Sequence, residues 1–387
     1  MKLVAQVKLQ TTPEQLAALK QTMQEANRAC DYISSVAWEK KTFNQYALHK
    51  LVYQDVRKQF GLSAQVVVRC IAKVADSFKL DKKRKRKFKP QGAITYDDRI
   101  LSWPLEQSRV SIWTTNGRIK IPFVCGAKQH ELLQTRKGES DLVFFRDKCY
   151  LSATCEIADS EPIQSEGVLG IDLGVVNIAV DSDGNTYSGK TINHVRFRHR
   201  RLRTKLQKKG TRSAKRLLKK LSGKEARFAK DVNHTISKQV VKLAQGTRRA
   251  IALEDLSGIR KRVTVRRDQR ARLHSWSFFQ LRMFLAYKAQ LAGVTVIPVD
   301  PRNTSRTCPQ CGWVDKRNRP AQSKFSCVSC GFSGFADHIA ARNISSRAVV
   351  SPPNVAHDEA KAVEMQSVSM ELRSSAVTSH PVLLGGS

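Results

Sequence analysis

The strongest constraint on the fold is a pair of C-x-x-C motifs in the last quarter of the sequence. Cys308 and Cys311 form the first pair, Cys327 and Cys330 form the second, and fifteen residues separate the two pairs. Each motif folds into a turn that points two thiolates at one ion, and a gap of this length lets a hairpin bring both pairs into one tetrahedral cage. We therefore predict one structural zinc ion with no open coordination position. Paired disulfides or an iron-sulfur site are the alternatives, but the spacing favours zinc.

The remaining cysteines are scattered through apolar or strand-like segments, which is typical of small core residues in a reducing compartment. They are Cys30, Cys70, Cys125, Cys149 and Cys155. No stretch approaches the roughly 20 apolar residues that span a bilayer, and the first residues lack the apolar run of a signal peptide. We expect a cytoplasmic protein that does not contact a membrane.

The charge of the chain indicates its partner. Lys and Arg number 68 against 33 acidic residues, for a net charge of +35. This excess is far beyond what solubility requires, so the surface must attract polyanions, and nucleic acid is the predicted partner. A ribosomal-type protein or a membrane-surface protein could carry the same charge. Charge alone therefore predicts a class of partner and no activity.

Two segments concentrate this charge. In residues 81 to 90 a basic run meets a proline, and the predicted phosphate contacts there are Lys82, Lys83, Arg84, Lys85 and Arg86. A nuclear localisation patch or a solvated loop would look similar. Residues 195 to 230 hold sixteen Lys or Arg and a single acid, Glu225, with leucines at helical spacing. These residues predict a basic helical hairpin, and because like charges repel along a helix, a phosphate-bearing partner is favoured over a solvated face. The predicted contacts on the hairpin are Arg196, Arg198, Arg200, Arg201 and Arg203.

The first 165 residues predict a β-rich module interrupted by helices. Residues 1 to 9 alternate in hydrophobicity, which is the period of a half-buried strand. Thr12, Pro13 and Gln15 then form the start signal of a helix, namely a capping box with proline at the first position. Helical spacing continues to about residue 80, and short β-like stretches follow between residues 109 and 157.

Two apolar strands are predicted to end in a carboxylate. Residues 168 to 180 resemble a strand, a glycine turn and a second strand, with Asp172 in the apolar hairpin. A charge there is costly unless it is compensated, and a divalent cation is one compensation, although an isolated Asp is commonly a turn residue. Residues 250 to 256 form a second such strand that ends in Glu254 and Asp255. Successive residues of a strand point to opposite faces, so only one of these two acids can face the same site as Asp172, and we select Glu254.

A third carboxylate, Asp337, follows the last zinc cysteine by seven residues at the start of an Ala-rich helix. Taken alone it is best explained as a helix N-cap. Together, a strand Asp, a strand-end Glu and a helix-start Asp are what a two-metal phosphodiester nuclease requires, with ions about 4 Å apart.

The order of these motifs resembles the TnpB proteins of insertion sequences, transposon-encoded RNA-guided DNA endonucleases related to the type V CRISPR effectors. The resemblance is carried by G-I-D-x-G at Asp172, L-E-D-L at Glu254, D-P-R-N-T-S at residues 300 to 305, the two zinc motifs, and D-x-x-A-A-R-N-I at Asp337. It implies that Asp172, Glu254 and Asp337 bind two magnesium ions and cut double-stranded DNA chosen by a guide RNA. It also implies a prokaryotic, cytoplasmic protein with one copy per guide RNA.

The same resemblance implies a multidomain α+β fold. A β-rich wedge domain (residues 1–10 and 91–165) would carry a helical recognition insertion (11–90). An RNase H-like, or RuvC-like, α/β nuclease domain (166–306 and 333–348) would carry a zinc ribbon (307–332), and residues 349–387 are predicted to form a disordered tail.

The sequence departs from the family pattern beside the last acid. Family members often have an acid two residues before it and an Asn two after it, where this chain has Phe335 and Ile339. His234 and Lys238 share a helix face and also echo the family, with a structural or RNA-side role expected. A guide-dependent repressor that no longer cuts and a strand-transferring transposase are the alternative functions.

Overall fold

The computed structural model describes residues 1–145, 147–255 and 278–350. The chain divides into two compact units, Met1–Ala158 and Asp159–Ser387, and each is described by itself. Residues 351–387 of the predicted tail lie outside the described residues, whereas Val349 and Val350 end the last helix. No helix among the described residues is long and apolar enough to cross a membrane.

The first unit contains a seven-stranded sheet in the order β2-β6-β7-β1-β5-β4-β3. Its strands are β1 (Lys2–Leu9), β2 (Ile94–Tyr96), β3 (Leu101–Ser102), β4 (Arg109–Thr114), β5 (Gly117–Val124), β6 (Arg136–Phe145) and β7 (Lys148–Glu156). The predicted first strand is confirmed, because β1 buries Ala5, Val7 and Leu9 on one face. It pairs antiparallel with both β7 and β5, so the N-terminal strand completes a sheet built from residues more than 80 positions later.

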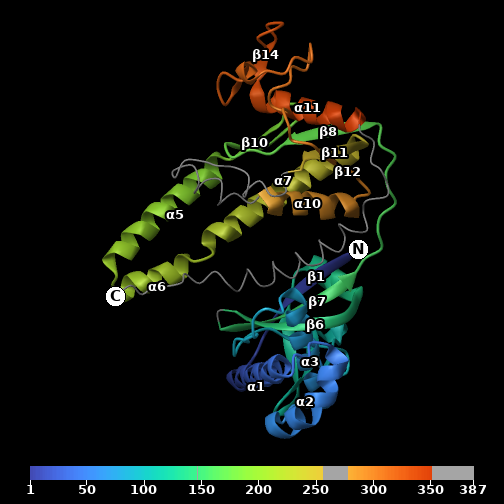
Figure 1. The fold of residues 1–387 in the computed structure, drawn as a ribbon, viewed down its shortest axis with the longest axis vertical. Helices are drawn as coiled ribbons and strands as arrows, with labels where there is room; N and C mark the ends of the chain where they lie inside the picture. The colour runs from blue at the N-terminus through green and yellow to red at the C-terminus, as the bar shows by residue number, and fades with distance from the viewer. Residues whose placement is uncertain (146, 256–277, 351–387) are drawn as a thin grey trace. The chain divides into compact units, whose positions relative to one another are not determined.

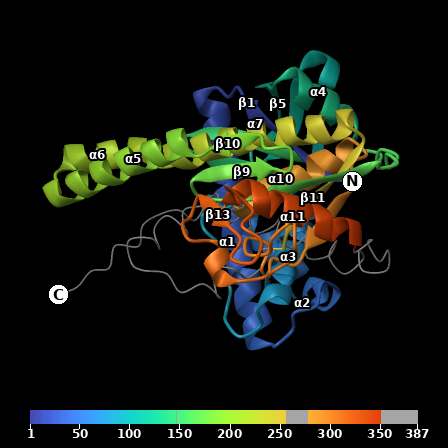
Figure 2. The same ribbon diagram turned by 90° about the horizontal axis from the view of Figure 1, so that it is seen from above.

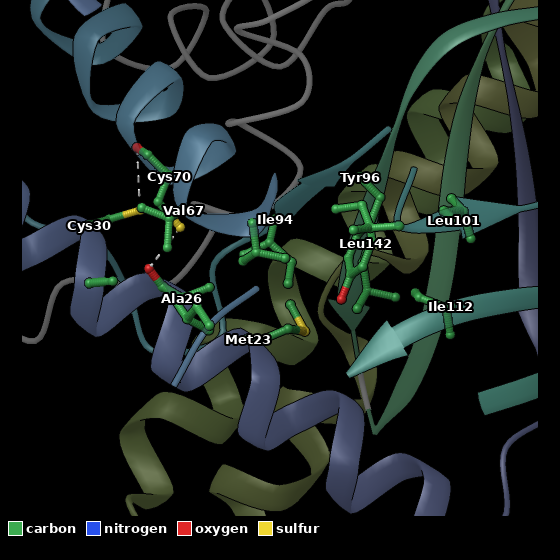
Figure 3. Packing of buried hydrophobic residues seen from close by; sticks show 14 of the residues in the cluster. Met23, Ala26, Cys30, Val67, Cys70, Ile94, Tyr96, Leu101, Ile112 and Leu142 are labelled. Carbon is green, nitrogen blue, oxygen red and sulfur yellow. Dashed lines mark hydrogen bonds between the residues drawn. The ribbon is translucent and has the colours of Figure 1, made fainter. Parts of the chain in front are cut away.

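Three long helices, α1 (Pro13–Glu39), α2 (Gln45–Phe60) and α3 (Ala64–Leu80), pack with this sheet, and the short α4 (Ala127–Gln134) follows β5. The predicted capping box is confirmed, since Thr12 and Gln15 exchange both of its hydrogen bonds at the start of α1. Cys30 of α1 and Cys70 of α3 face each other in the core, where each thiol donates to a backbone carbonyl of the other helix (Figure 3). Cys149 and Cys155 are also buried free thiols, as expected, and Cys125 is half-buried.

The second unit is built on a five-stranded sheet in the order β10-β9-β8-β11-β12. Its strands are β8 (Gly167–Asp172), β9 (Asn177–Asp181), β10 (Thr186–Ser188), β11 (Arg249–Glu254) and β12 (Val296–Val299). The strands β8, β9 and β10 form an antiparallel meander, whereas β11 pairs parallel with both β8 and β12. The parallel part places the carboxyl ends of β8, β11 and β12 at one edge.

Helices cover both faces of this sheet (Figure 1). Leu169, Ile171, Ile251 and Leu253 pack on one face against α7 (Lys224–Gly246) and α10 (Phe278–Leu291). The alternate residues Ala250 and Ala252 pack on the other face against α11 (Ala336–Val350), through side chains such as Ile344. Alternate residues of β11 point to opposite faces, and both faces are covered by helices, which explains why the strand is apolar throughout.

A basic helical hairpin precedes α7, as the sequence predicts. It consists of α5 (Lys190–Lys209) and α6 (Arg212–Leu221), which lie side by side in both views and end at a turn through Gly210 (Figure 2). The last element before α11 is the four-cysteine segment, residues 307–335, which contains the 3-10 turn Lys316–Asn318 and the small hairpin of β13 (Lys324–Ser326) and β14 (Ser333–Phe335).

Candidate active site

Asp172 and Glu254 stand side by side at the carboxyl ends of neighbouring strands. Ile171 of β8 is paired with Leu253 of β11 in parallel register, and each acid is the next residue along its strand. The buried apolar residues before them hold both strands in the core, so the two carboxylates emerge together at the sheet edge. The adjacent Asp255 turns away and forms an ion pair with Arg282 of α10. This divergence supports the choice of Glu254 over Asp255.

Asp337 reaches the same edge from the first turn of α11. The helix lies directly on β8, where a Cβ on Gly170 would come within 2.1 Å of the Ala341 carbonyl oxygen. Only glycine therefore permits this approach, two residues before Asp172. The amide of Asn177, at the start of β9, donates to the Asp337 carboxylate at 2.9 Å. Three separate elements thus deliver the three acids, which we call the acidic site (Asp172, Glu254 and Asp337).

The charges of the acidic site act on one another. Burial, and then the negative charges of Glu254 and Asp337, raise the pKa of Asp172 to about 7. Burial also raises the pKa of Glu254, and the hydrogen bond from Thr304 opposes that rise. A buried carboxylate with carboxylate neighbours is stabilised by a bound cation, because the cation removes both the desolvation cost and the repulsion.

Sequence reasoning missed a polar chain that orients Glu254. The hydroxyl of Thr304, after β12, donates to Glu254 Oε1. The buried side chain of Asn343 on α11 donates at 2.8 Å to the carbonyls of both Thr304 and Thr307. Both residues belong to motifs that carry the family resemblance, so the motifs were the available signal, but their contacts depend on how α11 packs against the loop.

Arg319 was also missed, and no spacing in the sequence singles it out. Its guanidinium donates at 3.1 Å to Asp337 and at 2.7 Å to the Gln322 carbonyl oxygen. Its positive charge lowers the pKa of both Asp172 and Glu254. Arg319 comes from the four-cysteine segment, which therefore supplies a cation to the acidic site.

The four predicted cysteines lie together. Their sulfur atoms are all within 4.8 Å of one another, and among the described residues they are the only such group of three or more His, Cys, Asp or Glu ligand atoms. The Cys308–Cys330 and Cys311–Cys327 sulfur pairs are each 3.6 Å apart, far beyond a disulfide bond of about 2.05 Å. The backbone N–H of Cys330 lowers the pKa of the Cys327 thiol, which favours the thiolate that metals bind. The segment can therefore hold one metal ion.

The two residues that depart from the family pattern have different environments. Ile339 is buried with Cys308, Phe325, Cys327 and Ala336 in a small core that joins α11 to the four-cysteine segment. Its position is structural. Phe335, at the end of β14, is 51% exposed and lies two residues before Asp337.

The predicted basic contacts near residue 85 are mostly on the surface. Lys82, Lys83, Arg84 and Lys85 are exposed. Arg86 instead donates at 2.7 Å to the Asp81 carbonyl oxygen, while its own carbonyl accepts from Ser34 of α1. Arg86 thus fastens the loop to the helix.

The basic hairpin shows the same division. Four of the predicted residues, Arg198, Arg200, Arg201 and Arg203, are exposed on α5. Arg196 is only 11% exposed and lies 3.6 Å from Glu225 of α7, so the structure gives it a bracing position in place of an open phosphate contact. His234 of α7 stacks on Phe284 of α10 with ring centroids 3.9 Å apart. This packing fits the structural role expected for it.

Family models match two parts of the chain. A model described as a probable transposase (OrfB, IS605) matches residues 152–257, and a model described as a Cas12f1-like TNB domain matches residues 278–344. The first match contains Asp172 and Glu254, and the second contains the cysteines and Asp337.

Solved structures share the fold. The Cas12f1-sgRNA-target DNA complex aligns over 84% of this chain and 82% of that chain, with a TM-score of 0.56 and 14% identity. The mini-RNA-guided endonuclease CRISPR-Cas_phi3 aligns over 91% and 93%, with a TM-score of 0.58 and 11% identity. The chain thus has a mixed α/β fold like that of type V effectors.

Curated relatives narrow the family. The Cas12f1 endodeoxyribonuclease of Sulfoacidibacillus thermotolerans is 38% identical over 33% of this chain, which is 29% of that protein. A second Cas12f1, from Syntrophomonas palmitatica, is matched over 37% of its length, so the chain spans about a third of these relatives. The putative RNA-guided DNA endonuclease InsQ of Escherichia coli K12 is 31% identical over 51% of this chain and 53% of InsQ. The TnpB-like protein MJ0751 of Methanocaldococcus jannaschii is 34% identical over 47% of this chain and 69% of its own length, and the chain therefore belongs to the TnpB family.

Proposed function

We propose that this protein is an RNA-guided, magnesium-dependent DNA endonuclease of the TnpB type. The observation that carries the proposal is the convergence of Asp172, Glu254 and Asp337, from two strands and a helix, at one edge of the second sheet. Relatives named as RNA-guided DNA endonucleases support the activity, and a relative solved with guide RNA and target DNA supports the partners.

The fold of the second unit supports an RNase H-like nuclease core. If its five strands are numbered along the chain, they lie in the order 3-2-1-4-5 across the sheet. Strands 1 to 3 pair antiparallel with one another, and strand 4 pairs parallel with both strand 1 and strand 5. We assign residues 166–306 and 333–348 to this RuvC-like domain. In the first unit we assign residues 11–90 to recognition and residues 1–10 and 91–165 to the wedge.

The acidic site is suited to divalent magnesium. Its donors are carboxylate oxygens, which Mg²⁺ prefers, and the pKa of Asp172 is raised by burial and then by neighbouring negative charge, both of which a cation would offset. When bound, two such ions supply an activated water and stabilise the leaving oxygen of the cut phosphodiester.

The residues of the chain have separate tasks in this scheme. Asp172, Glu254 and Asp337 hold the ions, and Thr304 fixes the orientation of Glu254 through its hydroxyl. Arg319 favours the ionised form of the acidic site, since its charge lowers the pKa of two of the carboxyls. It is also placed to offset negative charge on the phosphate that is attacked.

We assign zinc to the four-cysteine segment. Zinc bound at about 2.3 Å by four thiolates separates neighbouring sulfurs by about 3.8 Å, close to the spacing of 3.6 Å in the Cys308–Cys330 and Cys311–Cys327 pairs. With four protein ligands the ion holds structure and performs no chemistry. The ion orders the four-cysteine segment, which supplies Arg319 and packs against Ile339.

The exposed basic residues of α5 and of residues 82 to 85 are assigned to the guide RNA and the heteroduplex. They contact backbone phosphates, so sequence choice is left to base pairing between guide and target.

The test is to purify the protein with RNA transcribed from beside its own gene, then add magnesium and double-stranded DNA that matches the guide. We expect RNA to co-purify and the matched DNA to be cut, whereas DNA without the match stays intact. Asp172→Ala should abolish cutting and leave DNA binding nearly unchanged, because the phosphate contacts remain.

Other outcomes would assign a different function. Protection of the matched DNA without a break would indicate a guide-dependent repressor. Joining of transposon ends by the protein alone, without RNA, would indicate a transposase. Absence of both bound RNA and metal-dependent cutting would overturn the proposal.

A further inference from the structure

The β13–β14 hairpin presents two different faces. Phe325 and Gly334 are register partners, and their face is closed, because Phe325 is fully buried and a Cβ on Gly334 would lie 3.2 Å from Ile339. Lys324 and Phe335 are the partners on the opposite, outer face. Directly opposed residues of an antiparallel pair have Cβ atoms about 5 Å apart. The exposed Lys324 and the 51% exposed Phe335 are therefore cross-strand neighbours.

This hairpin leads directly into the helix that carries Asp337. Phe335 precedes Asp337 by two residues, and α11 begins at the residue between them. The backbone N–H of Ala336 donates at 3.1 Å to the Ser323 carbonyl oxygen, which fixes β14 against the chain just before β13. On the same turn, Arg319 bridges the Gln322 carbonyl oxygen and the Asp337 carboxylate. Phe335 and Lys324 thus belong to the same hairpin segment that carries Arg319 to Asp337, one of the proposed metal ligands.

A half-exposed phenylalanine is not by itself a binding site, since single exposed apolar residues are common. What distinguishes Phe335 is the chemistry beside it. An aromatic ring whose strand partner is Lys324 offers a stacking surface for a base together with positive charge for a phosphate that flanks it. In a duplex the base faces are already stacked on one another, so an open base face belongs to an unpaired nucleotide.

We propose that Phe335 stacks on an unpaired base of the DNA strand beside the bond that is cut, and that Lys324 pairs with an adjacent phosphate. This inference rests on the proposed nuclease function. It gives this chain a substrate-contacting aromatic ring where family members often have an acid, and it makes cutting depend on one base near the bond.

The experiment removes the base and the ring separately and together. Guide-matched DNA substrates carry an abasic nucleotide at successive positions on either side of the cut bond, and kcat and KM are measured for wild type and Phe335→Ala. Loss of one stacked base is expected to weaken substrate use about 10-fold. At one position the abasic substrate should cost wild type this factor and should cost Phe335→Ala almost nothing, because the ring and the base are partners.

Matched variants separate stacking from general apolarity. Phe335→Trp should retain the wild-type pattern, and Phe335→Leu should behave like Phe335→Ala. Trp313, also 51% exposed in the four-cysteine segment, provides the control, and Trp313→Ala should remain sensitive at the same position as wild type. Unchanged zinc content in each variant shows that the segment is intact. Independent, additive losses at every position, or coupling to Trp313 in place of Phe335, would overturn the inference.

A binding measurement keeps this result distinct from failure of the nuclease proposal. Full-length Asp172→Ala is mixed with single-stranded DNA that contains 2-aminopurine, whose fluorescence falls when it stacks. We expect quenching that Phe335→Ala relieves and Trp313→Ala does not. If wild type fails to cut matched DNA but this quenching is present, the nuclease proposal is wrong and the stacking surface remains. Equal quenching in all three proteins refutes the stacking surface.

Discussion

Replacing Asp172 with asparagine should stabilise the magnesium-free protein while it removes a proposed metal ligand. Burial and the nearby charges of Glu254 and Asp337 raise the pKa of Asp172 from 3.8 to about 7. Between these two values the unfolded chain has released the proton and the folded chain has kept it. The free energy of unfolding therefore falls as the pH rises through this window. At pH 8 the cost is roughly 4 kcal/mol, which an uncharged amide of the same shape avoids.

Thermal unfolding at two pH values tests this reasoning. At pH 8, in magnesium-free buffer without a chelator so that zinc is retained, Asp172→Asn should raise the Tm by on the order of 10 °C. At pH 5 the advantage should shrink to roughly 1.5 kcal/mol, because the folded carboxyl is then protonated and taking up that proton on folding costs less at lower pH. Added magnesium should raise the Tm of wild type and not that of the variant.

Asp255→Asn is the matched control, since this neighbouring acid faces Arg282 and its loss should not raise the Tm. If Asp172→Asn melts at or below the wild-type temperature at pH 8, or if its advantage is the same at pH 5, burial and neighbouring charge do not raise the pKa of Asp172 as described.

Three further variants probe the groups around the acidic site. Arg319→Gln removes the charge that lowers the pKa of Asp172 and Glu254, so the acid limb of the cleavage pH profile should move to higher pH; an unmoved limb would contradict this role. Thr304→Val removes the hydroxyl donor to Glu254, and loss of a hydrogen bond to a charged group should raise the magnesium concentration for half-maximal cutting about 10-fold or more, as a magnesium titration can measure. Cys327→Ser opens the four-sulfur cage, and metal analysis should find the zinc lost and the Tm lowered, whereas full zinc content would refute the assignment.

Local patterns predicted most of the elements. The alternation at residues 1 to 9, the capping box at Thr12 and the leucine spacing in the basic hairpin each depend on neighbours in sequence, and each is confirmed. The clustering of the four sulfurs was also predictable, because it depends on the spacing of the cysteines along the sequence. Selection of Glu254 over Asp255 followed from the two-residue period of a strand, and the structure places the two side chains in different surroundings.

The long-range contacts could not be predicted in this way. Arg319 acts on Asp337 through a turn whose position depends on the cysteine cage, and nothing in its flanking residues indicates the carboxylate. Gly170 matters only because α11, more than 160 residues later, packs on β8. Arg196 lies in a basic run that predicts phosphate contacts, but helix packing places its side chain beside Glu225. Its neighbours on the same helix are indistinguishable from it in sequence and remain exposed.

The small core beneath Ile339 limits how far this chain can be shortened. Ala336 and Ile339, on either side of Asp337, are buried against Cys308, Phe325 and Cys327. A miniaturised variant that lacks residues 307–332 would therefore expose the underside of the first turn of α11 to water and lose Arg319 as well. Engineers who want a smaller protein should therefore treat the four-cysteine segment and α11 as one inseparable part.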